Sequence, residues 1–212
     1  MGLCDLAREF VVAELSAHRP AETSAPLHQV IAERWSPRVL DPKAEITDGQ
    51  LRALFEAARW APSWGNSQPA RYLVGKRGDP TFERIYATLT RGNKSWAGSA
   101  GALVLGIAVT RGEDGEPVPY AEYGLGLATQ NLVLQAVAEG LVAHQMAGFS
   151  PDAAKAAFEL PEGMEPLVAI AIGHFGDGEG VDPGLVERDT KPRSRKPLDE
   201  LVFGSDWGTP AF

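Results

Sequence analysis

The sequence predicts one domain, spanning residues 1–212, that combines helices with a central sheet. Segments whose apolar residues recur at helical spacing, such as 47–58, alternate with short unbroken apolar runs, such as 102–109 and 167–173. With 212 residues, 44% of them hydrophobic, the chain can bury one sizeable core. Taken by itself, this alternation favours a parallel α/β sheet.

Composition excludes several classes of function. A formal net charge of −8 argues against a general nucleic-acid binder, because such a protein needs a broad basic surface. Cys4 is the single cysteine, so neither an internal disulfide nor a cysteine metal cage can form. Charged residues break up the apolar residues near the N-terminus, which argues against a signal peptide. No apolar run approaches the ~20 residues of a membrane span. We therefore expect a soluble, cytoplasmic protein with no nucleic-acid or membrane partner.

Local signals place the elements of the first half. Thr47 and Gln50 have the spacing of a capping box, and apolar residues then follow on one helical face. Turn formers and two tryptophans fill the segment that comes next. The expected elements are a helix over 3–15, a loop over 18–26, a helix ending before Arg34, a helix over 47–58, a loop over 60–69 and a strand over 71–75.

The second half is placed in the same way. Gly140 stands where a helix C-terminus favours glycine, and Ser150-Pro151 has the residues of a helix start. The expected elements are a helix over 81–89, a loop over 93–101, a buried strand over 102–109, an exposed loop over 111–119, a mostly buried helix over 120–139, a strand over 141–148, a helix from Ser150 and a buried strand over 167–173.

Both ends of the chain lie outside this pattern. We expect residues 1–26 to form an N-terminal helical extension, and the tail over 177–212 has few apolar residues before Leu198. A tail of this composition has no core of its own, and the helix over 120–139 is apolar on more faces than one subunit covers. We expect the tail to pack on a second subunit, in a homodimer.

Two arginine clusters far apart in the sequence suggest an anion site. Arg34-Trp35-Ser36-Pro37-Arg38 places two guanidinium groups and a hydroxyl within five residues, and Arg193-Ser194-Arg195 repeats this chemistry. Guanidinium groups and hydroxyls recognise phosphate through charge-assisted hydrogen bonds. We predict that both clusters converge on one phosphate, although either one alone is also typical of a solvated surface turn.

Motifs between residues 27 and 203 resemble the nitroreductase family of flavin enzymes. Arg34, Ser36 and Arg38 match its Arg-x-Ser-x-Arg/Lys turn, and the segment 61–69 matches its Ala-Pro-Ser-x-x-Asn-x-Gln-Pro loop. A long helix ending in Gly140-Leu141, the Gly148-Phe149 pair that follows, and the late basic pair Arg193 and Arg195 also fit. Trp35 stands where relatives often have His or Arg, and Ala147 stands where some have Glu.

The resemblance implies a fold and a cofactor. The family fold is α+β, a three-layer sandwich in which helices flank a mixed, mostly antiparallel sheet, built into an intertwined homodimer with FMN at the interface. This expectation replaces the parallel sheet, because no strand is followed by a glycine-rich phosphate turn. FMN would carry the chemistry, passing hydride from NAD(P)H to nitroaromatics, quinones or similar small-molecule acceptors.

The same resemblance assigns the site residues. Arg34, Trp35, Ser36 and Arg38 would hold the phosphate with Arg193 and Arg195. Asn93 would reach the flavin ring from the same subunit, and the backbone of Ala147 and Gly148 would lie beside its reactive N5. Pro62, Ser63 and Asn66 would come from the other subunit.

No catalytic side chain is expected. The sequence contains no evident Ser/His/Asp or Cys/His set, and its histidines lack metal-ligand spacing. His144 is either a core residue or part of the pocket, and Trp60, Trp64 and Trp96 either roof the pocket or pack in the core. Two alternatives stay open: another flavin reaction on this fold (dehalogenation, ring oxidation or flavin fragmentation), or a non-catalytic flavin-binding module.

Overall fold

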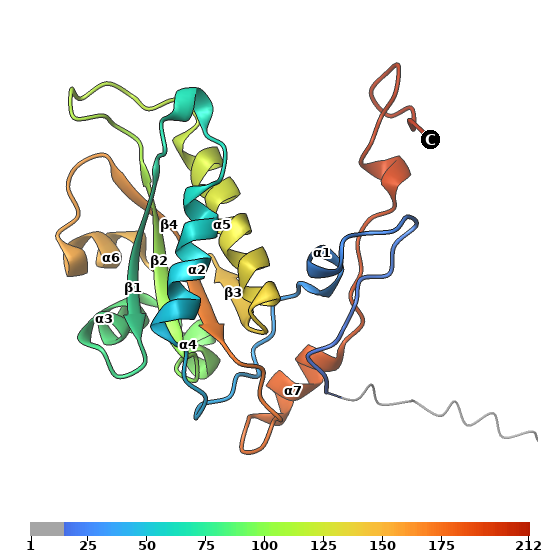
Figure 1. The fold of residues 1–212 in the computed structure, drawn as a ribbon, viewed down its shortest axis with the longest axis horizontal. Helices are drawn as coiled ribbons and strands as arrows, with labels where there is room; N and C mark the ends of the chain where they lie inside the picture. The colour runs from blue at the N-terminus through green and yellow to red at the C-terminus, as the bar shows by residue number, and fades with distance from the viewer. Residues whose placement is uncertain (1–14) are drawn as a thin grey trace, which may run out of the picture.

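A computed structural model of the chain describes residues 15–212, so the helix expected over 3–15 falls outside the described residues apart from its last position. Figure 1 shows the arrangement of the elements. The helices are α1 (Gln29–Glu33), α2 (Asp48–Arg59), α3 (Pro80–Thr88), α4 (Arg91–Ala97), α5 (Ala121–Ala138), α6 (Pro151–Phe158) and α7 (Pro183–Thr190), with short 3-10 turns η1 (Trp64–Asn66) and η2 (Leu198–Glu200). The strands are β1 (Ala70–Lys76), β2 (Ala102–Val109), β3 (Val142–Met146) and β4 (Met164–Gly173).

The four strands form an antiparallel sheet in the order β1-β2-β4-β3. The parallel sheet favoured by simple alternation is therefore wrong, and the α+β expectation is confirmed. β2 and β3 do run parallel to each other, with α5 as the helix between them, because each is antiparallel to β4. β4 lies between these two strands, and so every hydrogen-bonded neighbour is antiparallel.

Helices cover both faces of the sheet and give three layers (Figure 1). Leu54 of α2 and Leu132 of α5 pack with Val104 on one face, whereas Ile85 of α3 and Trp96 of α4 pack with Leu105 on the other. Val104 and Leu105 are neighbours in β2, and successive strand residues point to opposite faces. The central strand is therefore apolar on both sides, as its unbroken apolar run predicts.

The local signals at helix ends are confirmed. The Thr47 hydroxyl accepts a hydrogen bond from the backbone N–H of Gln50, and the Gln50 side-chain oxygen accepts one from the backbone N–H of Thr47, which completes the capping box of α2. Gly140 has φ 71° beyond the end of α5. The hydroxyl of Ser150 accepts from the Ala153 backbone at the start of α6.

The loop expected over 93–101 is wrong, because most of it belongs to helix α4. Gly92, Asn93 and Gly98 are loop-forming residues by composition, and Thr90 provides no side-chain cap. The helix is stabilised by burial instead, since Trp96 is only 4% exposed and Ala97 is fully buried. Tertiary packing thus overrides a weak helix propensity.

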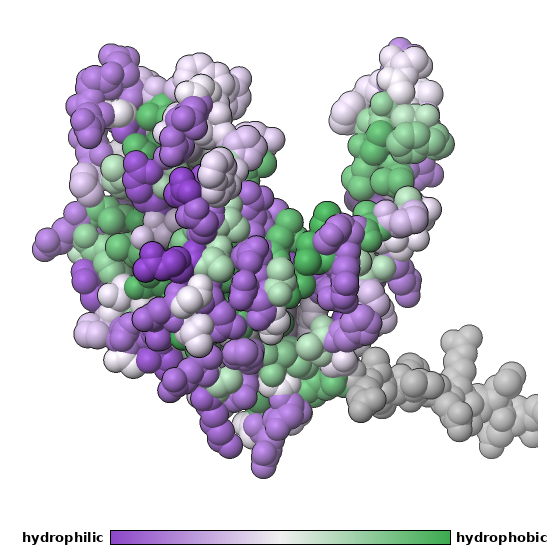
Figure 2. Space-filling view, in the orientation of Figure 1, coloured by the Kyte–Doolittle hydropathy of each residue, from purple (hydrophilic) through white to green (hydrophobic). Residues whose placement is uncertain are grey.

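The end of the chain forms an arm that projects from the body, as Figure 1 shows beyond α7. We call residues 191–212 the C-terminal arm; residues 17–28 run beside its base, where Arg19 donates to the carbonyl of Lys191. The arm exposes the apolar side chains Leu198, Leu201, Val202, Trp207 and Phe212. Figure 2 shows a green, hydrophobic area on this arm, which stands away from the body. Within residues 15–212, no helix combines the length and apolarity that a membrane crossing requires.

Candidate functional site

The two arginine clusters lie together in the folded chain. We call residues 34–38 the arginine turn; it follows α1 directly. Arg193 donates to the main-chain carbonyl of Arg34 at 2.8 Å and to that of Ala32 at 2.9 Å. It also donates to the carbonyl of Arg19. Arg193 therefore ties the arm to the arginine turn, with three hydrogen bonds already made to backbone.

The positive charges of the two clusters act on one another. Burial lowers the pKa of Arg34, and the nearby charge of Arg195 lowers it further. Burial likewise lowers the pKa of Arg193, with added repulsion from Arg34, Arg195 and Arg19. The ordinary pKa of a guanidinium lies so far above neutrality that arginine side chains stay charged in proteins. The cluster is thus a concentrated positive site in a chain whose net charge is −8.

Ser36 and Trp35 have different surroundings. The Arg34 guanidinium donates to the hydroxyl of Ser36 at 3.3 Å, so that two of the predicted phosphate ligands are adjacent. The indole of Trp35 is buried: its Nε1 donates to the carbonyl of Ala17, and its ring packs against Phe175 at 5.6 Å. The Trp35 side chain therefore supports the turn from within the core.

Two buried polar side chains form hydrogen bonds with the backbone of the arginine turn. His144 of β3 donates from Nδ1 to the carbonyl of Pro37 at 2.9 Å, and its ring lies 4.6 Å from that of Trp96. Asp189 of α7 accepts from the backbone N–H groups of Arg38 and Val39. Of the two interpretations of His144, the structure supports the buried one.

Two neighbouring charges of opposite sign act on the guanidinium of Arg38. Burial lowers its pKa, Arg188 lowers it further, and the carboxylate of Asp189 acts in the opposite direction. An acid and a base from α7 thus flank this position. Neither Arg188 nor Asp189 carried a signal in the sequence, where the run Glu187-Arg188-Asp189 has the composition of a solvated surface.

Asn93 and Gly148, both predicted site residues, are in contact. The Asn93 side chain donates from Nδ2 to the Gly148 carbonyl at 2.9 Å. A Cβ at position 148 would lie 2.6 Å from Asn93 Nδ2 and 2.9 Å from Thr90 Oγ1, so a side chain there would displace Asn93 from its present position. Ala147, next to this pair, is exposed. His144 lies on β3, and Gly148 follows two residues after that strand ends, so the same stretch of chain contacts the arginine turn and Asn93.

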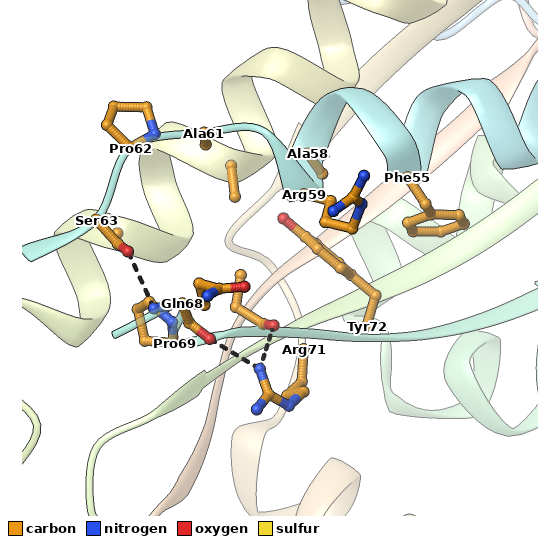
Figure 3. Close-up of a pocket in the computed structure, with 13 residues that line it drawn as sticks. Phe55, Ala58, Arg59, Ala61, Pro62, Ser63, Gln68, Pro69, Arg71 and Tyr72 are labelled. Carbon is orange, nitrogen blue, oxygen red and sulfur yellow. Dashed lines mark hydrogen bonds between the residues drawn. The ribbon is translucent and has the colours of Figure 1, made fainter. Parts of the chain in front are cut away.

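The loop over 60–69 borders a cavity of about 180 Å³ between α2, β1 and α5 (Figure 3). Pro62 and Ser63 line it, and Ser63 Oγ accepts from the backbone of Gln68 at 3.0 Å. Asn66 is exposed and outside the lining. The other lining residues are Phe55, Ala58, Arg59, Ala61, Gln68, Pro69, Ala70, Arg71, Tyr72, Gly124 and Ala128.

The backbone of this loop is unusual. Gly65, Asn66 and Gln68 have φ values of 54°, 57° and 46°. Non-glycine residues in this region are uncommon, and asparagine tolerates it better than most. Trp60 and Trp64 on the same loop are exposed, whereas Trp96 is in the core. The loop thus presents two large aromatic side chains to solvent.

The structure does not bring this loop to the arginine turn within one chain. In Figure 1, η1 lies at the top of the view beyond α2, well apart from α1, which leads into the arginine turn, and from α7. The predicted residues thus form two groups. One contains Arg34, Ser36, Arg38, Arg193 and Arg195 together with the Asn93–Gly148 end, and the other contains Pro62, Ser63 and Asn66.

Comparisons with known proteins agree with this architecture. The chain matches the model of the Nitroreductase family over residues 31–87 and 79–174. It is 40% identical, over 148 residues, to an uncharacterized 15.4 kDa protein in the ask 5′ region of Mycolicibacterium smegmatis, covering 66% of this chain and 99% of that protein. It is 27% identical, over 180 residues, to a Streptomyces coelicolor protein named provisionally as an NADH dehydrogenase/NAD(P)H nitroreductase, covering 71% of this chain and 88% of that one.

A solved structure described as an oxidoreductase containing FMN superposes with a TM-score of 0.83 at 28% identity. The superposition covers 91% of this chain and 97% of that one. The family match spans more than half of the chain and includes the arginine turn, the 60–69 loop and the sheet. The chain therefore belongs to the nitroreductase family.

Proposed function

We propose that this protein is an FMN-dependent oxidoreductase that passes hydride from NAD(P)H to a small-molecule acceptor such as a nitroaromatic or a quinone. The observation that carries the proposal is the meeting of the two arginine clusters, joined by the bond from Arg193 to the Arg34 carbonyl. Like charges held together in a folded protein repel one another, and a bound anion relieves that repulsion. The FMN-containing oxidoreductase with the same fold supports a flavin phosphate as that anion.

The residues of the two arginine clusters have the chemistry needed to bind the phosphate of FMN. Arg34 and Ser36 lie next to each other, and the charge of Arg195 acts on Arg34. Arg38 joins the same turn, so that these residues would bind the phosphate. Ala147, which is exposed, and the Asn93–Gly148 contact would face the flavin ring, at the other end of β3.

FMN supplies the hydride acceptor and donor when bound. The chain itself binds the phosphate, orients the ring and leaves one face open for the nicotinamide and then for the acceptor. We assign no general base, because the buried polar groups described beneath the arginine turn, His144 and Asp189, are both bonded to its backbone. The name of the Streptomyces coelicolor relative supports NAD(P)H as the reductant.

A second copy of the chain would complete the site as a homodimer. The loop carrying Pro62, Ser63 and Asn66 lies away from the arginine turn of its own chain (Figure 1). The C-terminal arm leaves the body with Trp207 92% exposed and Phe212 84% exposed. An apolar arm of this kind is stabilised by packing against a partner, and twofold dimers are the commonest closed assembly.

One preparation tests the proposed function. The purified protein is expected to be yellow with one FMN per chain, and anaerobic NADH or NADPH should bleach the flavin absorbance. A screen of nitroaromatics and quinones should then restore the colour. Protein that retains FMN but is bleached by neither nicotinamide would contradict the proposed reductant and favour a flavin-binding module.

A further inference from the structure

Asp189 is the only buried acidic side chain among residues 15–212, with 2% of its surface exposed. It lies near the end of α7, about 150 residues after the arginine turn in the sequence. Its Oδ2 accepts from the N–H of Arg38 at 2.6 Å and from the N–H of Val39 at 2.8 Å. A buried carboxylate is destabilising unless such bonds compensate it, so these contacts are strong and specific.

The hydrogen bonds that Asp189 accepts are part of a set in which side chains from elsewhere in the chain bind the backbone of the arginine turn. Arg193 donates to the carbonyl of Arg34, and His144 donates to the carbonyl of Pro37. Asp189 then accepts from the next two N–H groups along the chain. The N–H groups of Arg38 and Val39 are therefore already bonded within the protein, and the side chains of Arg34, Ser36 and Arg38 remain as groups that could bind a ligand.

The charge of Asp189 has a second effect. Arg38 faces repulsion from Arg188, and Asp189 opposes that repulsion. The carboxylate therefore holds Arg38 by its backbone and also offsets the positive charge around it before any anion is bound. The hydrogen bonds that Asp189 accepts come from main-chain N–H groups. Among the described residues, the Arg38 guanidinium forms no ion pair with the Asp189 carboxylate.

We infer that Asp189 is a positioning residue that preorganises the arginine turn, and that it thereby sets the preference of the site for phosphorylated flavin over riboflavin. This inference rests on the proposed function, because it takes the anion at the turn to be the flavin phosphate. Preorganised donors bind an anion more tightly, since no ordering of the turn has to accompany binding.

The test compares FMN with riboflavin, which lacks the phosphate. In Asp189→Asn, one buried negative charge is lost and an amide N–H₂ replaces one of the two carboxylate oxygens, so that a single neutral acceptor remains for the N–H groups of Arg38 and Val39. The dissociation constant for FMN, measured by flavin fluorescence on the apoprotein, should rise about tenfold, whereas that for riboflavin should stay within about twofold. A purely structural role would change both ligands alike.

The matched control is Asp182→Asn at the other end of α7. Asp182 is exposed and caps the helix by accepting from the Gly184 backbone at 2.8 Å. It should leave the ratio of the two dissociation constants unchanged. An unchanged ratio in Asp189→Asn, or an equal loss of both ligands, would overturn the inference.

Hydrogen exchange on the wild-type protein tests the same inference without a variant, and so it remains usable if Asp189→Asn does not fold. In the flavin-free protein, the amides of Arg38 and Val39 should already exchange slowly, and FMN should slow them little further. Fast exchange that becomes slow only with FMN would show that the turn is not preorganised, and would overturn the inference. Wild-type protein that binds no FMN would instead overturn the proposed function.

Discussion

The guanidinium of Arg193 donates a 2.8 Å hydrogen bond to the main-chain carbonyl of Arg34, 159 residues earlier in the chain. It also donates to the carbonyls of Ala32 and Arg19. Arg195, two residues later, is exposed and acts on Arg34 only through its charge. The two arginines of one motif therefore differ: Arg193 binds the backbone of distant segments, whereas Arg195 leaves its charge exposed beside Arg34.

Arg193→Lys should lower stability, because a lysine ammonium cannot reproduce the fork that reaches these carbonyls. We expect a loss of about 1–3 kcal/mol, at about 1 kcal/mol for each net hydrogen bond. Urea unfolding followed by circular dichroism measures it. Arg195→Ala is the paired control and should unfold like the wild type. Equal stability of both variants would contradict the division of roles.

Arg38→Ala combined with Arg195→Ala should lose FMN. Each arginine contributes a charge-assisted bond of about 1.5–3 kcal/mol to a phosphate, so affinity should fall by at least about 100-fold for the pair. FMN content after desalting is the measurement. The control removes the exposed charges of Lys43 and Arg52 and should keep its flavin. Stoichiometric FMN in the double variant would remove these arginines from the site.

Asn66 allows its side chain and its backbone to be tested separately. Its φ of 57° favours asparagine or glycine, and alanine there costs about 1 kcal/mol. Asn66→Gly keeps the backbone and deletes the amide, whereas Asn66→Ala also strains the loop. Both should slow flavin reduction in stopped-flow measurements if the amide contacts the flavin of a partner. Wild-type rates in Asn66→Gly would exclude Asn66 from the site.

His144 makes stability depend on pH. Burial lowers its pKa, so the unfolded chain binds a proton more readily than the folded one on acidification. Its contribution is fully present above the ordinary histidine value of about 6.5 and is lost as the pH falls through that range. Thermal unfolding at pH 7 and pH 5 should therefore show a larger decrease for the wild type than for His144→Gln. Matching decreases would mean that His144 is not the titrating group.

Features that depend on neighbouring residues could be predicted before the chain was seen folded. The capping box at Thr47, the glycine beyond α5 and the apolar run of β2 are short-range signals, and all three elements formed where they predict. The arginine clusters were visible for the same reason, because each is a run of consecutive residues. Their motif also identified the family.

Other features depend on contacts between distant residues and could not be predicted in this way. α4 exists because Trp96 and Ala97 are buried, and β4 makes the sheet antiparallel by lying between β2 and β3. Asp189 looks like a surface charge until α7 places it beneath Arg38. Each of these features joins groups that are far apart in sequence, and burial and hydrogen bonding between such groups arise only once the chain has folded.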